Sequence, residues 1–154
     1  MRHAGCAFCD LTQFRAAEVF FENGFCIYAS TRDPRDPLDV LPGCGVIIPI
    51  EHVVSPFDFT PEQWTATHEL LLKAKAAQDD RLSPDGYTLI WNSYAEGGQP
   101  MHHAHLHVIP RFDDEPLADQ GGRSAIKSPE NRRPDPSAPG NGRAQAFGPV
   151  SRPL

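Results

Sequence analysis

His103, His105 and His107 stand at alternate positions in the sequence, and this spacing limits the local structure more than any other motif. The residues between them are small or branched and apolar. Successive side chains of an extended chain point to opposite faces of the strand. The pattern therefore predicts a β-strand with three imidazoles on one face, bounded by a glycine pair before it and by Pro110 after it.

A row of three imidazoles is a poor component of an apolar core, because the ring is polar and titrates near neutral pH. The purely structural explanation is either an exposed strand face or histidines that are each satisfied by a local backbone partner. Two functional explanations stand beside it. Either the rings are ligands of a catalytic metal ion, or one neutral imidazole is a nucleophile whose neighbours orient it and bind oxygens of the target.

Apolar runs rich in β-branched and aromatic residues predict four further strands. Asn23-Gly24 separates the first two runs and is a strong signal for a hairpin. A proline-rich loop is expected at residues 30–44. The four expected strands cover residues 19–21, 25–28, 45–50 and 87–91.

A long helix is expected between the third and fourth of these strands. Thr60 and Gln63 have the spacing of a capping box, and Pro61 suits the first helical position. Apolar residues then recur at helical spacing, so we expect the helix to run to about Arg81.

The sequence around the histidines resembles the signature of the histidine triad (HIT) superfamily of nucleotide hydrolases and transferases. That signature is His-φ-His-φ-His-φ-φ, where φ is apolar, preceded by Gly-Gln and followed by Pro-Arg. The resemblance extends over roughly residues 6 to 115, and implies an α+β, HIT-like fold with an antiparallel sheet of about five strands, one long helix packed on it, and a homodimer. The segments that carry it are Cys6-x-x-Cys9, Pro42 to His52, Asn92, Gly98-Gln99 and His103 to Arg111.

The resemblance implies a nucleotide hydrolase that passes through a nucleotidyl-histidine intermediate. Its substrate would be a dinucleoside polyphosphate or a nucleoside phosphoramidate. His105 would be the nucleophile and His107 would lie close to the phosphate oxygens, while His103 would orient the row or bind zinc. A nucleotidyltransferase or phosphorylase of the same family would use the same nucleophile with another acceptor. The alternatives from other classes are a zinc-dependent hydrolase with the three histidines as ligands, and a nucleotide-binding module without catalysis.

Four further residues are expected at the substrate. The resemblance places Asn92 against the bound nucleotide. Gln99, with backbone N–H groups near Gly98, is expected to stabilise negative charge on the phosphate oxygens. Asp33 is the nearest acidic candidate for a contact with ribose. Pro100 stands where many relatives carry a side-chain donor, so the handling of the leaving group is expected to differ.

The two cysteines near the N-terminus, Cys6 and Cys9, form a Cys-x-x-Cys motif, which supplies only half of a tetrahedral zinc site. The few residues before Cys6 leave no room for the strand that a thioredoxin-like redox motif requires. The resemblance completes a structural zinc site with His52 and His103, which would tie the N-terminus to the sheet. The rival histidine ligands are His3 and His102.

The charge of the chain is uneven, with a net −6 that divides into −9 over residues 1–115 and +3 over residues 116–154. An acidic protein of this kind is not expected to bind nucleic acid through its overall charge, so an anionic substrate must be held by local donors. No apolar run approaches the ~20 residues of a membrane span, and the N-terminus lacks the apolar core of a signal peptide. We therefore expect a cytoplasmic protein without a membrane partner.

The length suits one folded domain with an extension. We expect a HIT-like domain over residues 1–115 and a C-terminal extension over residues 116–154. Twelve of the 39 residues in the extension are proline or glycine, and few are large and apolar. Such a composition buries little surface, so we expect the extension to be partly disordered or draped over the domain, with residues 131–154 disordered or lying on a partner.

Overall fold

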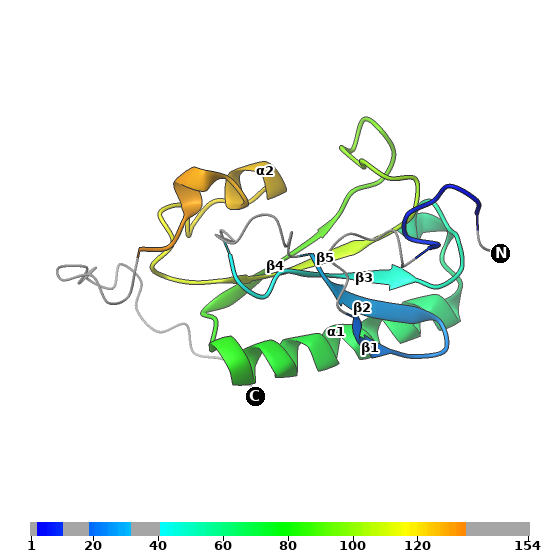
Figure 1. Cartoon of the computed structure of the whole chain (residues 1–154), viewed down its shortest axis with the longest axis horizontal. Helices are drawn as coiled ribbons and strands as arrows, with labels where there is room; N and C mark the ends of the chain where they lie inside the picture. Colours follow the sequence, from blue (N-terminus) through cyan, green and yellow to red (C-terminus); the bar gives the residue numbers. More distant parts are fainter. Residues whose placement is uncertain (1–2, 11–18, 32–40, 135–154) are drawn as a thin grey trace.

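The computed structural model describes residues 3–10, 19–31 and 41–134 of the chain. A five-stranded antiparallel sheet forms its centre, with the strands in the order β1-β2-β3-β5-β4 (Figure 1). The predicted α+β fold, with five antiparallel strands and one long helix, is confirmed. The strands are β1 (Val19–Glu22), β2 (Cys26–Ser30), β3 (Gly45–Pro49), β4 (Gly86–Trp91) and β5 (Leu106–Arg111).

The long helix α1 (Pro61–Leu82) covers one face of this sheet (Figure 1). Its predicted capping box is present, because the Gln63 N–H donates to the Thr60 hydroxyl and the Thr60 N–H donates to the Gln63 side chain. Ser83 ends the helix in the left-handed conformation, with φ of 46°. The core between helix and sheet consists of Cys26, Tyr28, Ile47, Ala66, Leu70, Ala74, Leu106 and Val108.

The predicted hairpin between β1 and β2 is confirmed, and one side chain explains how it is held. The Asn23 side-chain oxygen accepts hydrogen bonds from the N–H groups of Phe25 and Cys26, which closes the turn. The Asn23 side-chain amide donates to the carbonyl of Ala66 in α1. A single asparagine therefore shapes the turn and fastens the hairpin to the helix.

The opposite face of the sheet is covered by the two ends of the described chain. The N-terminal loop packs through Phe8 on Ile27, Val46 and Ile48, and the segment after β5 packs through Ile126 farther along the same face (Figure 1). Between these two covers lie the histidines of the predicted motif. Within the described residues, no helix combines the length and the apolar character that crossing a membrane requires.

The strand that carries the histidines has different boundaries from those predicted. β5 begins only at Leu106 and continues through Pro110. Pro110 pairs with Tyr87 of β4, whereas the pairing of β5 with β3 ends at Val108. The N–H that proline lacks is therefore not needed for the β3 ladder, and the strand continues through it.

Residues 112–134 fold back onto the sheet and include the short helices α2 (Arg123–Ile126) and η2 (Pro129–Asn131). A third short helix, η1 (Pro56–Asp58), precedes α1. Asn131 is fully buried, so the expectation that disorder begins at this residue is wrong. Residues 135–154 lie outside the described residues, and the division of the chain at residue 115 stays a prediction.

Candidate active site

The histidine row lies on the sheet face opposite α1. His107 pairs with Val46 of β3 and with Ile90 of β4, so it stands in the middle of the sheet. His103 and His105 lie on the chain that leads into β5. All three are buried, with at most 4% of any one of them exposed. The row is therefore not an exposed strand face.

His105 is held in one tautomer by the backbone. Its Nδ1 atom lies 2.9 Å from the carbonyl oxygen of His103. Because a carbonyl only accepts hydrogen bonds, we assign the proton to Nδ1, which leaves the lone pair of the neutral ring on Nε2. The ring of His107 stands edge-on to His105, with 4.9 Å between the ring centres. In its neutral form, His105 is therefore oriented as an imidazole nucleophile next to a second imidazole.

His103 is held in the opposite tautomer. Its Nε2 atom lies 2.9 Å from the carbonyl oxygen of Pro49, so the proton is assigned to Nε2 and the lone pair to Nδ1. That Nδ1 atom faces the sulfur atoms of Cys6 at 3.4 Å and Cys9 at 3.6 Å. Burial of the ring lowers the pKa of His103 to about 4. The ring is therefore neutral at physiological pH and presents its lone pair to the two cysteines.

The expected zinc ligands come together as one cluster. The ligand atoms of Cys6, Cys9, His52 and His103 all lie within 4.8 Å of one another. A tetrahedral zinc ion, with Zn–S of about 2.3 Å and Zn–N of about 2.0–2.1 Å, requires sulfur and nitrogen ligands about 3.6 Å apart. Three of the four sulfur–nitrogen distances are 3.3, 3.4 and 3.6 Å. The four residues therefore fit a closed tetrahedral ion.

The local fold of the N-terminal loop explains how both cysteines face the sheet. The N–H groups of Cys9 and Asp10 donate to the carbonyl of Cys6, which forms a tight turn between the two thiols. Desolvation lowers the pKa of His52, followed by the neighbouring imidazole of His3, so this ring also favours its neutral, metal-binding form. Burial raises the pKa of the Cys9 thiol, which a bound cation would reverse.

The two rival histidines lie beside the cluster rather than in it. His3 stacks on the ring of His52, with the ring centres 4.9 Å apart, and its Nδ1 atom bonds to the backbone of Ala4. His3 and His102 line a cavity of about 620 Å³ on the outer side of the cluster. Among the described residues, the group with converging ligand atoms contains neither of them.

Gln99 has a structural position that the sequence did not reveal. Its side-chain amide donates to the carbonyl of Val54 at 2.8 Å, and its side-chain oxygen accepts from the Tyr94 N–H at 2.7 Å. Gln99 is 7% exposed. Its amide therefore holds the loop before the histidines, and the predicted contact with phosphate oxygens is untested.

The other predicted substrate residues are only partly placed. Asn92 follows β4, and its side-chain amide lies 3.4 Å from the carbonyl oxygen of Gly98. Gly98 has φ of 75°, which favours glycine at the turn. Asp33 lies outside the described residues. The contact between Asn92 and Gly98 brings two of the predicted residues together next to the histidine row.

Phe8 is a member of this site that the sequence analysis missed. Its ring meets His105 edge-on with 5.1 Å between centres, and meets His103 in the same way at 5.9 Å. Its place inside the Cys-x-x-Cys motif was the available signal, because the turn that gathers the two thiols also presents the residue between them. Phe8 therefore connects the cysteine loop to the candidate nucleophile.

The three histidines of the row do not form a metal site together. In the described part of the chain, the group with ligand atoms close to one another includes His103 but neither His105 nor His107. The Nδ1 atom of His105 faces a carbonyl instead. This geometry favours a histidine nucleophile over a catalytic metal held by all three rings.

Comparison with known sequences identifies the family of this chain. The HIT domain family model matches residues 15–114. An uncharacterised HIT-like protein from Synechocystis sp. is 32% identical over 93 residues, which cover 60% of this chain and 77% of the relative. A purine nucleoside phosphoramidase from Escherichia coli is 29% identical over 76 residues, which cover 49% of this chain and 60% of that enzyme.

Solved structures agree with the sequence comparison. A HIT family protein from Bacillus anthracis superposes with a TM-score of 0.64 at 26% identity, covering 77% of this chain and 80% of that one. A zinc-bound histidine triad family protein from Mycobacterium smegmatis superposes with a TM-score of 0.58 at 25% identity, covering 77% of this chain and 84% of that one. With the family model matching well over half of its length, this chain belongs to the HIT domain family.

Proposed function

We propose that this chain is a nucleotide hydrolase that forms a nucleotidyl intermediate on His105. One observation carries the proposal: Nδ1 of the buried His105 ring lies 2.9 Å from the carbonyl oxygen of His103, so the neutral form of the ring carries its lone pair on Nε2. Membership in a family of nucleotide-acting proteins, and the name of the phosphoramidase relative, support nucleotides as the ligand class.

The reaction would proceed in two displacements. The Nε2 lone pair of His105 attacks the α-phosphorus, a P–N bond forms, and the bond to the leaving group breaks, with its electron pair departing on that group. The positive charge on the ring is stabilised by the His103 carbonyl at Nδ1. Water then attacks the phosphorus, the P–N bond breaks, and the water proton passes to solvent as the nucleoside monophosphate leaves.

The substrate would be a nucleoside phosphoramidate or a dinucleoside polyphosphate. His107, whose ring centre is 4.9 Å from that of His105, is placed to bind oxygens of the attacked phosphate. Pro100 offers neither a side-chain donor nor an N–H to the leaving group. We therefore favour dinucleoside polyphosphates, because their nucleotide leaving group departs as a stable anion, whereas an amine leaving group requires a proton donor. A transferase or phosphorylase would share the first displacement and differ only in the acceptor.

We also propose that Cys6, Cys9, His52 and His103 hold a structural zinc ion. The ligand spacing and the neutral rings support it, and a zinc-bound relative in the family is consistent with it. When bound, such an ion would contribute folding free energy by joining the N-terminal loop to the sheet. The chemistry at phosphorus would remain with His105 and His107.

A homodimer is the proposed assembly. β4 is the last strand in the sheet order, and it exposes Leu89, which is 48% accessible to solvent. An open edge with an exposed apolar side chain is a common place for a second copy to pair. Light scattering should give twice the chain mass, and Leu89→Lys should lower it to one chain. A monomeric wild-type protein would refute the proposal.

The test of the proposed function is hydrolysis of adenosine 5′-phosphoramidate and of a diadenosine polyphosphate, with and without a chelator. Wild-type protein should release AMP, whereas His105→Gly should lose at least ~10³-fold in kcat, as the loss of a nucleophile does elsewhere. His107→Asn should retain measurable turnover. Activity that disappears on chelation while the protein stays folded, and returns with metal, would overturn the histidine mechanism. Tight nucleotide binding without any turnover would instead identify a binding module.

A further inference from the structure

The segment after β5 is built into the same sheet face as the histidines. Side chains on one face of a strand recur every second residue, so His107, Ile109 and Arg111 share a face. Ile126 is fully buried against Ile109 and Cys44. The segment that covers this face, which we call the cover, therefore begins over Ile109, the next residue after His107 on the same face. Lys127, which follows Ile126, lies at the edge of the cover.

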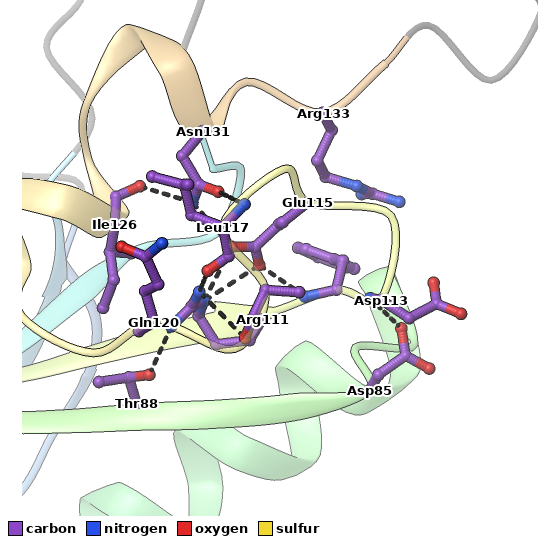
Figure 2. Close-up of polar contacts among 12 residues, drawn as sticks. Asp85, Thr88, Arg111, Asp113, Glu115, Leu117, Gln120, Ile126, Asn131 and Arg133 are labelled. Atoms are coloured by element: carbon purple, nitrogen blue, oxygen red, sulfur yellow. Dashed lines mark hydrogen bonds and ion pairs between the residues drawn. The ribbon is translucent and has the colours of Figure 1, made fainter. Parts of the chain in front are cut away.

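A buried polar network fixes this cover in place (Figure 2). The Arg111 Nε atom donates to both carboxylate oxygens of Glu115, at 3.1 and 2.9 Å. Asn131 donates to Glu115 and to the carbonyl of Ile126, both at 2.8 Å. Glu115, Asn131 and Ile126 are fully buried. The backbone next to Ile126 is therefore held rigidly relative to β5.

Arg111 itself is not available to a ligand, although arginine commonly binds phosphate. Its Nη1 atom donates to the Thr88 hydroxyl and to the Gln120 carbonyl, and its Nη2 atom donates to the Leu117 carbonyl. Its charge faces the buried carboxylate of Glu115. Another cation must serve if an anionic group is bound on this face.

Lys127 is the candidate for this cation. It directly follows Ile126, and its ammonium nitrogen lies 3.4 Å from the hydroxyl oxygen of Thr31. Both side chains are half-buried. Within the described residues, no carboxylate lies at ion-pair distance from Lys127. A half-buried cation that contacts a hydroxyl, and that has no carboxylate partner among the described residues, is suited to an anion.

Thr31 lies on the histidine face at a useful distance from His107. Ala29 and His107 both pair with Val46, and Thr31 is two residues beyond Ala29, so its side chain returns to the same face. Two strand spacings across the sheet and two residues along it place the Cα atoms of Thr31 and His107 about 12 Å apart. A nucleotide bound with its scissile phosphate at the histidines and its sugar directed towards Lys127 would span this distance.

We propose that Lys127, with the Thr31 hydroxyl, binds a second phosphate on the ribose of the nucleotide and so selects substrates that carry one. The proposal rests on the proposed function, because it takes the scissile phosphate to lie at His105. A cation at the ribose favours a phosphorylated sugar, whereas the acidic contact expected there, with Asp33 as its candidate, would favour the free hydroxyl. The net charge of −9 over residues 1–115 makes such a local cation necessary for a doubly phosphorylated ligand.

Calorimetric binding of AMP, adenosine 2′,5′-bisphosphate and adenosine 3′,5′-bisphosphate tests the inference. Wild-type protein should bind at least one bisphosphate ~10-fold more tightly than AMP, the size of one charge-assisted hydrogen bond. Lys127→Gln should abolish this gain and leave AMP affinity unchanged. The matched control, Lys73→Gln, removes the same charge from the exposed side of α1 and should change nothing.

Equal affinity for AMP and both bisphosphates, or a gain that survives Lys127→Gln, would overturn the inference while leaving the proposed function intact. ADP carries its second phosphate on the phosphate chain rather than on another position of the ribose. Its affinity therefore shows which of the two positions Lys127 recognises. A gain for ADP alone that is lost in Lys127→Gln would place the lysine at the chain and refute the ribose assignment. Failure of every nucleotide to bind would refute the proposed function itself.

Discussion

His103 contacts both the cysteines of the proposed zinc site and the proposed nucleophile His105, and it does so through different atoms. Its ring nitrogen Nδ1 faces the cysteines, while its backbone carbonyl accepts the proton of His105. The sequence analysis treated metal binding and orientation of the row as competing roles for this residue. The two roles are compatible in the structure, because the side chain of His103 faces the cysteines while its backbone carbonyl faces His105.

At the residue scale, the first prediction concerns the pH dependence of the metal-free protein. Burial lowers the pKa of His103 from 6.5 to about 4 in the folded state. The unfolded chain therefore binds more protons between these values, and the free energy of unfolding should fall by roughly 3 kcal/mol as the pH drops from about 6.5 to about 4. Urea titrations should show this loss, and His103→Gln should reduce it. An identical slope in the variant would contradict the assignment.

Phe8 gives the second prediction. Its ring is buried against His105 and three apolar side chains of β2 and β3. Phe8→Ala should lower the free energy of unfolding by about 3–5 kcal/mol, as removal of a buried phenyl ring does. The matched control is Phe57→Ala, because Phe57 is 83% exposed and should cost less than about 0.5 kcal/mol. Equal effects of both substitutions would refute the packing role of Phe8.

The sequence predicted which residues lie close together better than it predicted the hydrogen bonds that each side chain makes. The spacing of the cysteines and the family pattern brought Cys6, Cys9, His52 and His103 together correctly as a cluster. The expected contact of Gln99 with phosphate is untested, and the sequence did not predict the bonds that its amide makes to backbone groups of two loops. Such contacts depend on where distant loops meet, which neither composition nor periodicity encodes.

At the element scale, the packing of residues 112–134 on the sheet depends on the buried ion pair between Arg111 and Glu115. Glu115→Gln should leave the Arg111 charge buried without compensation and cost about 3–5 kcal/mol in the free energy of unfolding. Asp114→Asn is the matched control, since the Asp114–Arg133 pair is about one-third exposed and contributes at most ~1 kcal/mol. Chemical denaturation of both variants would distinguish them. Similar losses in the two would contradict the role assigned to the network.

Regular elements were predictable because their signals are local. The capping box of α1 and the Asn23-Gly24 turn lie within a few residues and were both correct. The start of β5 and the packing of residues 112–134 were not predictable in this way. Pro110 is tolerated because of where β3 ends its pairing, and Asn131 is buried because of a carboxylate 16 residues away.

At the scale of the whole molecule, the cysteine cluster should couple metal binding to folding. Elemental analysis should find about one zinc ion per chain, and Cys9→Ser should lose this zinc. Cys26→Ala is the control and should retain it, because Cys26 lies in the core between α1 and the sheet. Chelation should lower the unfolding temperature before it lowers turnover at moderate temperature. Full zinc content in Cys9→Ser would refute the site.

The central claim is that His105 forms a covalent bond to the nucleotide. Intact-mass measurement of wild-type protein, quenched soon after mixing with adenosine 5′-phosphoramidate or a diadenosine polyphosphate, tests it directly. The account predicts an added AMP group that maps to His105 and is absent from His105→Gly. Turnover of either compound by wild-type protein without any such adduct, together with substantial turnover by His105→Gly, would contradict it.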